Sequence, residues 1–329
     1  MKAVTQDSYG SADVLELRDI ERPEPKPDEV LIRVHAAGVD QGVRRRMTGL
    51  PWLVRPGFGL RRPKTPVPGL DIAGVVEAIG PEVGDFRVGD PVFGTCTTGS
   101  LAEYAVARAD RIAPLPPGLG FEQAAAIPVS ASTALQGLRD HARLRAGQRV
   151  AITGASGGVG HFAVQLAKIF GAAVTGVCGP AKQDMVRGLG ADHAIDYTRE
   201  DFTQGTQRYD VILDIAGNRP VAQLRRALAP DGTLVIVGGS GGDRWTGGVH
   251  RQAGAMIRSP FTRQNLKSFI ATARREDLLF LMGLAEAGRF APVIDRIWPL
   301  AETAEAIRRL EAGHARGKSV IAVHRDGQV

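Results

Sequence analysis

The chain has 329 residues, which is enough for two domains of ordinary size, each with its own hydrophobic core. No apolar run approaches the roughly 20 residues that a membrane-spanning helix needs, and the N-terminus lacks the apolar stretch of a signal peptide, so we expect a cytoplasmic protein that binds no membrane. Cys96 and Cys178 are the only cysteines, which excludes a disulfide framework and a four-thiolate zinc site, and the 41 Lys and Arg only modestly exceed the 35 Asp and Glu.

The first part of the chain, up to about residue 120, is rich in short alternating segments that Pro and Gly interrupt. Examples are residues 30–35, 72–77 and 103–106. This pattern predicts a β-rich domain. Further along, apolar strands alternate with helices, which is typical of a doubly wound parallel sheet. The expected strands are residues 150–153, 173–177, 194–196, 211–215 and 234–237.

The last part of the chain is expected to return to the β-rich domain, which would make that domain discontinuous. The predicted elements are helices around 266–274 and 277–287, the segment 293–300, an amphipathic helix 301–312 and a strand 319–323. The expected division of the chain is 1–121 for the first part of the β-rich domain, 122–262 for the domain with the parallel sheet and 263–329 for the part that returns to the β-rich domain.

A glycine-rich turn lies between the strand 150–153 and a helix that begins near Gly160. Ser156, Gly157, Gly158 and Val159 form this turn. Glycines let a backbone approach a pyrophosphate closely, and the N–H groups at a helix N-terminus attract its charge. The first glycine of the usual G-x-G-x-x-G pattern is replaced by Ala155, but the strand before the turn and the helix after it predict a dinucleotide site.

The end of the second strand of this domain decides which dinucleotide is expected. NAD-binding proteins place Asp or Glu about 20 residues after the glycines, where it holds the ribose hydroxyls. Here the stretch contains Cys178, Gly179 and Lys182 but no carboxylate. Lys182 can pair with a 2′-phosphate, so we expect NADPH rather than NADH. A solvated lysine at the start of a helix is the alternative interpretation.

Two further segments follow predicted strands at the edge where an open parallel sheet binds ligands. We expect them to contact the cofactor, although Gly-Gly pairs also occur in plain loops. These residues are Gly217, Asn218, Gly238, Gly239 and Ser240.

Several motifs together resemble the zinc-independent, quinone oxidoreductase-like branch of the medium-chain dehydrogenase/reductase family. They are Tyr9-Gly10 and residues 13–17, 27–31, 68–76, 89–94, 188–192 and 313–318. The resemblance implies an α/β protein with a Rossmann doubly wound parallel sheet and a discontinuous GroES-like β-rich domain, commonly as a homodimer. It also implies that Thr133 faces the nicotinamide and that Tyr197 lies near the phosphate.

The same resemblance indicates whether a catalytic zinc ion is expected. Zinc-dependent relatives carry a Cys, a His and a Glu at the positions of Asp40, Leu70 and Asp71. Leucine cannot ligate a metal, so we expect no zinc. Without a Lewis acid, hydride transfer is easiest to a conjugated acceptor, which delocalises the developing charge onto a distant oxygen.

The candidate residues of the first domain are fewer. Asp40 replaces an Asn that often lies near the nicotinamide, and it is a candidate contact to ribose or substrate. Tyr9 is a candidate proton donor, although packing in a hairpin accounts for it equally well. Trp52 and Phe58 lie in an apolar segment broken by Gly and Pro, which forms either a lid over a hydrophobic pocket or a surface loop.

These observations predict an NADPH-dependent oxidoreductase that transfers hydride to a quinone or an α,β-unsaturated carbonyl. A zinc-free alcohol dehydrogenase that uses NADP and a low-turnover NADPH-binding protein that binds RNA or a partner are the alternatives. Arginine clusters such as residues 44–46 could bind phosphates, but Arg is frequent throughout the chain, and nucleic acid is not the expected partner.

Overall fold

The computed structural model describes residues 1–238, 244–259, 262–313 and 315–324. The chain forms two compact units, one made of Met1–Ser132 and Ala273–Val329 and the other of Thr133–Thr272. Both boundaries lie later than the expected 121/122 and 262/263. The first differs because helix α3 (Phe121–Ala125) packs on strands of the first unit, and the second because a strand after residue 262 pairs with the sheet of the second unit.

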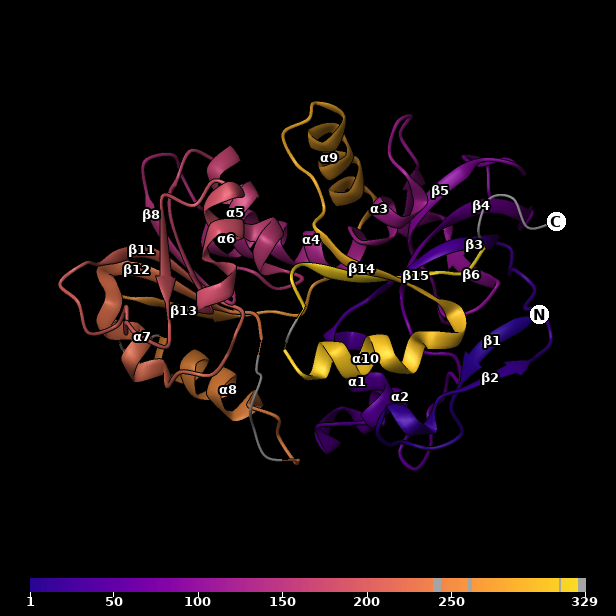
Figure 1. The fold of residues 1–329 in the computed structure, drawn as a ribbon, viewed down its shortest axis with the longest axis horizontal. Coiled ribbons are helices and arrows are strands. Elements are labelled where there is room, and N and C mark those ends of the chain that lie inside the picture. The colour runs from indigo at the N-terminus through magenta and orange to yellow at the C-terminus, as the bar shows by residue number, and fades with distance from the viewer. Residues whose placement is uncertain (239–243, 260–261, 314, 325–329) are drawn as a thin grey trace. The chain divides into compact units, whose positions relative to one another are not determined.

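The second unit contains a parallel sheet whose strands, within the described residues, follow the order β10-β9-β8-β11-β12-β13 (Figure 1). Neighbouring strands are all parallel, and the side chains of the central strands β8, β9 and β11 are almost continuously buried, as expected for a sheet covered on both faces. This order makes it a Rossmann-type doubly wound sheet, in which the strand order switches between β8 and β11. The strands are β8 (Arg149–Thr153), β9 (Ala173–Cys178), β10 (His193–Asp196), β11 (Tyr209–Asp214), β12 (Leu228–Ile236) and β13 (Asn265–Ser268).

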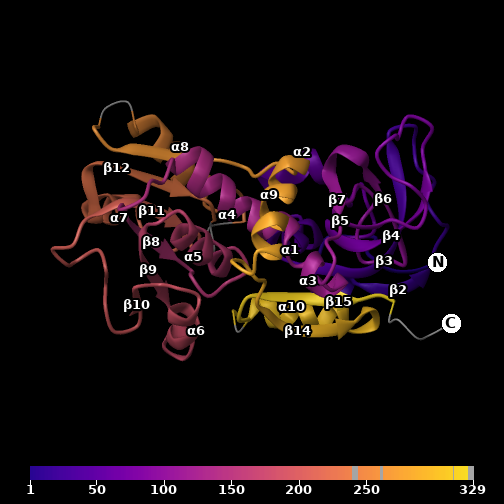
Figure 2. The same ribbon diagram turned by 90° about the horizontal axis from the view of Figure 1, so that it is seen from above.

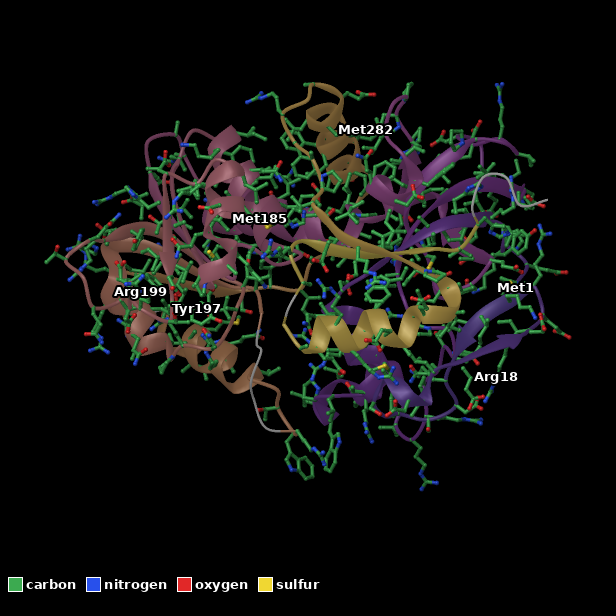
Figure 3. The ribbon with its side chains drawn as sticks, in the orientation of Figure 1. Met1, Arg18, Met185, Tyr197, Arg199 and Met282 are labelled. Carbon is green, nitrogen blue, oxygen red and sulfur yellow. The ribbon has the colours of Figure 1, made fainter. Side chains whose placement is uncertain are left out.

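Helices lie on both faces of this sheet (Figures 1 and 2). Helices α5 (Gly160–Ile169) and α6 (Gln183–Gly188) follow β8 and β9, whereas α7 (Val221–Ala227) and α8 (Val249–Arg258) follow β11 and β12. The chain moves outward from β8 and from β11 in opposite directions. Right-handed crossovers therefore place the two pairs of helices on opposite faces. Met185 marks α6 in Figure 3.

The structure corrects one predicted element of this unit. The sequence predicts a helix around residues 266–274, but residues 265–268 form strand β13 beside β12. Leu266 is buried while Asn265 is exposed, which fits a short strand. Four residues are too few to distinguish the strand period from the helix period, and the pairing with a distant strand decides the outcome.

The first unit is built on a mainly antiparallel sheet in which β3 lies between β15 and β4 and only the β14–β15 pair is parallel among the described residues. The strand order is β14-β15-β3-β4-β5-β7 among the described residues, with β6 also paired to β3, and β1 pairs separately with β2. Strand β15, near the end of the chain, runs antiparallel to β3. The strands are β1 (Lys2–Thr5), β2 (Glu16–Asp19), β3 (Glu29–Val39), β4 (Asp71–Ile79), β5 (Pro91–Thr95), β6 (Tyr104–Arg108), β7 (Ile112–Pro114), β14 (Ile294–Pro299) and β15 (Lys318–Ala322).

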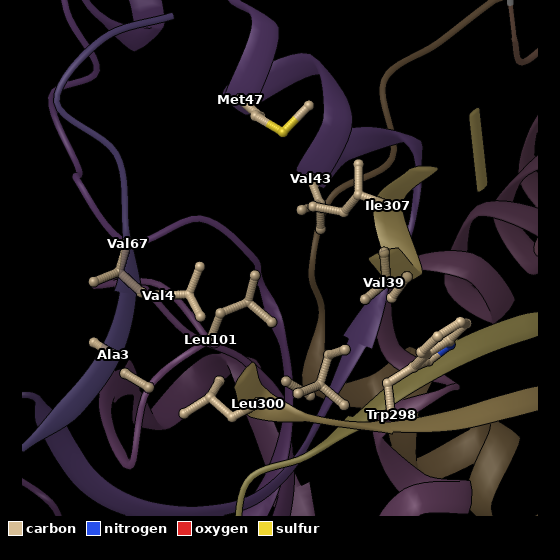
Figure 4. Packing of buried hydrophobic residues seen from close by; sticks show 14 of the residues in the cluster. Ala3, Val4, Val39, Val43, Met47, Val67, Leu101, Trp298, Leu300 and Ile307 are labelled. Carbon is tan, nitrogen blue, oxygen red and sulfur yellow. The ribbon is translucent and has the colours of Figure 1, made fainter. Parts of the chain in front are cut away.

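Helix α1 of this unit begins two residues after β3 ends. The helices are α1 (Gln41–Thr48), α2 (Arg55–Phe58), α3, α9 (Arg275–Glu286) and α10 (Thr303–Glu311), and α4 (Pro128–Leu135) contains the boundary between the units. Val43 and Met47, one turn apart on α1, pack with Ile307 of α10 and with Val39 in a buried cluster (Figure 4). This packing fixes α1 directly after β3. In the described part of the chain, every helix is too short or too polar to cross a bilayer.

Candidate functional site

The glycine turn of the second unit has the backbone shape that a dinucleotide requires. Gly154 has a φ of +69°, a conformation that favours glycine. It therefore permits the tight turn, although Ala155, the next residue, replaces the first glycine of the sequence pattern. A Cβ on Gly160 would lie 2.0 Å from the carbonyl oxygen of Gly154, and one on Gly157 would lie 3.3 Å from the same oxygen. The turn therefore accepts only glycine at Gly160, where α5 begins.

Backbone amides in this turn remain available to a ligand. The N–H groups of Gly157 and His161 donate to carbonyls of the turn, but within the described ranges no backbone acceptor is paired with the N–H of Gly158 or Val159. Both amides precede the N-terminus of a ten-residue helix, where the helix dipole favours negative charge. Ser156, in the same turn, is buried. The arrangement fits the pyrophosphate of a dinucleotide.

The end of β9 lies beside the end of β10. Asp196 pairs in register with Cys178, and the N–H of Tyr197 donates to the carbonyl of Cys178 at 3.2 Å. A Cβ on Gly179 would lie 3.7 Å from the Tyr197 ring, so the exposed phenol borders this turn (Figure 3). Lys182 closes the short helix that follows.

Asp196 lies beside this edge because β10 pairs with β9, and its hydrogen bonds hold it in place locally. Its Oδ1 accepts from the N–H and the hydroxyl of Thr198, at 2.9 and 2.8 Å. The carboxyl groups expected in NAD-specific proteins stand at the end of the second strand, whereas Asp196 belongs to the third. Burial raises the pKa of Cys178, so its thiol lines the turn without a charge.

A buried network supports the sheet edge where β8 and β11 meet, and the sequence did not reveal it. Thr153 Oγ1 donates to Asp214 Oδ1 at 2.8 Å and accepts the N–H groups of Ile215 and Ala216. Arg251 Nη2 lies 2.7 Å from Asp214 Oδ2, and Arg251 Nη1 donates to the carbonyl of Gly217 at 2.8 Å. Ionic and hydrogen-bonded contacts thus fix the turn after β11.

This network positions some of the sequence-predicted cofactor residues. Gly217 is buried with a φ of +66°, and Asn218 next to it is exposed. A Cβ on Gly238 would lie 2.1 Å from the carbonyl oxygen of Ile215, so the two strand ends approach closely there. Thr133 is buried on α4. Gly239 and Ser240 lie outside the described residues.

The first unit brings two acidic side chains to one ammonium group. Lys318 Nζ, at the start of β15, lies 3.0 Å from Asp71 Oδ2 and 3.9 Å from Asp40 Oδ2, and it donates to Ser130 Oγ at 3.1 Å. Asp71 and Lys318 are buried almost completely. Burial raises the pKa of Asp71 to about 7, and the Lys318 ammonium opposes that rise. Asp71 Oδ1 also accepts the N–H of Val129 at 2.9 Å.

Asp40 stabilises the N-terminus of α1. Its Oδ1 accepts the N–H groups of Gly42 and Val43, at 2.7 and 3.1 Å, and so caps the N-terminus of α1. The other oxygen is the one that faces Lys318. A contact between Asp40 and ribose or substrate stays a prediction.

Tyr9, Trp52 and Phe58 belong to one cation–aromatic cluster. The Tyr9 hydroxyl donates to the carbonyl of Gly59 at 2.7 Å, and burial raises the pKa of the phenol while Arg55 opposes the rise. The phenolic proton is therefore occupied in a structural bond, which argues against Tyr9 as the proton donor. Trp52 is exposed on a short helical turn, and Phe58 is half-buried on α2.

Comparisons with known proteins match both units. Residues 26–117 match the alcohol dehydrogenase GroES-like domain, and residues 189–321 match a zinc-binding dehydrogenase domain. The chain is 32% identical to a chloroplastic quinone-oxidoreductase homolog of Spinacia oleracea, with 98% of each chain covered. It is 33% identical to a chloroplastic NADPH-dependent alkenal/one oxidoreductase of Arabidopsis thaliana, covering 98% of this chain and 79% of the relative.

The chain belongs to the quinone oxidoreductase-like branch of the medium-chain dehydrogenase/reductase family. The structure of the quinone oxidoreductase from Coxiella burnetii superposes with a TM-score of 0.86 at 29% identity, covering 98% of this chain and 99% of the other. Both the Rossmann sheet and the GroES-like domain expected from the sequence are therefore confirmed.

The family resemblance aligns Asp40, Leu70 and Asp71 with the metal ligands of zinc-dependent relatives. In this structure the Lys318 ammonium lies 3.9 Å from Asp40 Oδ2 and 3.0 Å from Asp71 Oδ2. A divalent cation would have to displace this buried ammonium, while Leu70 offers no donor atom. Cys96 is buried, which raises the pKa of its thiol to about 12. Among the described residues, no three His, Cys, Asp or Glu side chains are grouped to hold a metal ion.

Proposed function

We propose that this chain reduces a quinone or an α,β-unsaturated carbonyl with NADPH, and that it does so without a catalytic zinc ion. The relatives named above support the reaction class, since one is a quinone-oxidoreductase homolog and another is an NADPH-dependent alkenal/one oxidoreductase. The observation that carries the zinc-free part is the Lys318 ammonium between Asp40 and Asp71.

The reaction balances as a hydride and a proton added to the acceptor. When bound, NADPH would supply the hydride, two electrons and a proton, to a quinone or to the β-carbon of an enone, and would itself be oxidised to NADP⁺. The resulting phenolate or enolate then takes a proton from solvent, which yields the hydroquinone or the saturated carbonyl. Conjugation delocalises the negative charge that develops on the acceptor during hydride transfer, so no Lewis acid is needed to stabilise it.

The residues of the second unit bind and orient the cofactor. The amides of Gly158 and Val159 would bind the pyrophosphate, while Gly160 lets α5 begin against the carbonyl of Gly154. Lys182 and the Tyr197 phenol would hold the 2′-phosphate at the end of β9, where a carboxylate would repel it. The network around Asp214 holds the turn at Gly217 in place without needing a ligand.

The cofactor assignment is tested by comparing affinities for NADPH and NADH. In Lys182→Glu, the affinity for NADPH should fall about tenfold or more, because a charge-assisted contact becomes a repulsion, while NADH should bind within about twofold. Arg145→Glu makes the same charge change at an exposed site of the same unit and serves as the control. Equal affinity of Lys182→Glu and the unaltered protein for NADPH would refute the assignment.

The reaction class is tested by following NADPH oxidation with a quinone, an enone and a simple alcohol with NADP⁺ in the reverse direction. Turnover of the quinone or enone without added metal, and after treatment with a chelator, is the expected result. Activity that disappears with the chelator and returns with zinc would overturn the metal-free reaction. Turnover of the alcohol alone would favour a zinc-free alcohol dehydrogenase.

We also propose a homodimer. Strand β13 lies at an edge of its sheet, and within the described residues it pairs only with β12. An edge strand offers unpaired N–H and C=O groups to a second copy. Sedimentation at several protein concentrations tests this, and a mass of one chain at every concentration would contradict it.

A further inference from the structure

The positive charge of this chain is concentrated in one stretch. Residues 41–70, which we call the acid-free segment, contain seven Lys and Arg and no Asp or Glu. Since the whole chain has a formal net charge of +6, the residues outside the acid-free segment have a net charge of −1. The seven cations are Arg44, Arg45, Arg46, Arg55, Arg61, Arg62 and Lys64.

Most of these cations lack an acidic partner. Arg44 pairs with Glu311 of α10 at 3.0 Å. For the other six, no carboxylate of a described residue lies within 4.0 Å. Arginines elsewhere in this unit, such as Arg18 and Arg308, are paired with two acidic residues each. The acid-free segment has no acidic residue of its own to pair with its cations.

Two of these guanidinium groups are held in place by aromatic rings. The Arg55 guanidinium carbon lies 4.7 Å from the centre of the Tyr9 ring and 5.7 Å from that of Trp52. Its Nε donates to the carbonyl of Gly49 at 3.0 Å, which leaves its Nη groups without an acceptor among the described residues. Arg46 lies over the Phe58 ring at 5.3 Å. Stacking of this kind fixes a guanidinium while leaving its N–H edge to bind an anion.

The two arginines belong to one surface. Arg55 and Phe58 stand three residues apart on α2, so their side chains share a face, with Cβ atoms about 5–6 Å apart. Arg46 covers the Phe58 ring, the Tyr9 ring contacts Arg55, and the Tyr9 hydroxyl donates to the carbonyl of Gly59, next to Phe58. The aromatic rings and the two guanidinium groups therefore form a continuous patch that can take a flat group and its negative charge together.

We propose that the acid-free segment binds an oxyanion carried by the hydride acceptor, so that the preferred substrates are conjugated carbonyl compounds with a carboxylate or a phosphate. Arg46 and Arg55 supply the contacts to the oxyanion, and Trp52 and Phe58 contact the planar part. This inference rests on the proposed reductase function. A neutral quinone or enone would leave both guanidinium groups without a counter-charge.

Matched pairs of acceptors test this directly. One pair is acetylacrylate and its ethyl ester, which differ by a carboxylate. The other pair is crotonyl-coenzyme A and the crotonyl thioester of N-acetylcysteamine, which differ by the phosphates. At low salt, at least one charged member should have a higher kcat/KM than its neutral partner, and the pair in which this happens identifies the oxyanion. Added salt should reduce the preference.

Single variants locate the effect. In Arg46→Gln and in Arg55→Gln, the ratio of kcat/KM for the charged acceptor to that for its neutral partner should fall about tenfold, the value of one hydrogen bond to a charged group. Arg55→Lys keeps the charge and should retain part of the ratio. Arg87→Gln removes an exposed cation elsewhere in the same unit and should leave the ratio unchanged.

Binding measurements separate this inference from the reductase function. Levulinate and butyryl-coenzyme A are saturated counterparts that cannot accept hydride, and calorimetry compares each with its neutral partner. If no acceptor is reduced, the proposed function fails, and the calorimetry still decides whether the acid-free segment binds the anion. Equal binding of charged and neutral compounds, or a ratio unaffected in both Gln variants, overturns the inference. It is overturned equally if the variants lose affinity only for an RNA oligonucleotide.

Discussion

The buried pair of Asp71 and Lys318 makes a pH-dependent prediction about stability. In Lys318→Met, Asp71 keeps only the Val129 N–H as a partner and loses the ammonium 3.0 Å away. Removing one member of a buried ion pair typically costs about 3–5 kcal/mol, because the remaining charge is left without compensation. Asp71 has no exposed surface to relieve this cost, so we expect a loss within that range at alkaline pH.

The sign of the pH dependence follows from the raised pKa of Asp71. The native state holds this proton up to about pH 7, whereas the unfolded chain has lost it above about pH 4. The stability that this carboxyl contributes is therefore complete below pH 4 and decreases as the pH rises through 7. Without Lys318 the pKa of Asp71 rises further, so the decrease continues beyond pH 7. The decrease in unfolding free energy that Lys318→Met causes, relative to the unaltered protein, should be about 2 kcal/mol larger at about pH 8.5 than at about pH 6.

Urea unfolding, followed by circular dichroism at both pH values, measures this difference. Lys168→Met is the matched control, because Lys168 pairs with Asp192 on the surface and should cost less than about 1 kcal/mol at either pH. Replacing both members, as in Asp71→Leu with Lys318→Met, should restore much of the stability. A loss in Lys318→Met that is the same at both pH values, or no larger than that of Lys168→Met, would refute the reasoning.

Three other variants test the site residues. Gly160→Ala should weaken NADPH binding at least tenfold, because its Cβ would meet a carbonyl oxygen at 2.0 Å, whereas Gly188→Ala has open space and should be neutral in a binding titration. Tyr9→Phe should keep kcat within about twofold and lose about 1 kcal/mol of stability, so a large drop in kcat would restore Tyr9 as the proton donor. Asp40→Ala should lower the unfolding free energy by about 0.5–2 kcal/mol through the lost cap, while Asp40→Asn should retain the cap, and equal losses in both would contradict that explanation.

The sequence was sufficient for the features whose causes are local. Residues 150–153 are apolar and stand before a glycine turn and a helix, so the strand, the turn and their order could all be predicted. The absence of a carboxylate at Cys178–Lys182 is likewise visible in one short stretch. The family motifs then placed these pieces in a known topology, including the return of the last strand to the first unit.

Features that depend on distant partners could not be predicted. Lys318 meets Asp71 across 247 residues, and Arg251 reaches Asp214 across 37, with no periodic pattern to indicate either contact. An aspartate at the end of the apolar strand before Gly217 was the available signal for the second network. The four residues of β13 show the same limit, because pairing with β12 decided their conformation.

The place of β15 has a consequence for how the protein is made. Its residues, Lys318–Ala322, join β3 near the middle of the GroES-like sheet, and β3 is synthesised almost 300 residues earlier. On the ribosome, β3 therefore lacks its β15 neighbour until residues 318–322 have been made, by which time the contiguous Rossmann unit has already been synthesised. The nucleotide-binding half can mature first, and the nascent β3 edge is the part that most needs protection by chaperones.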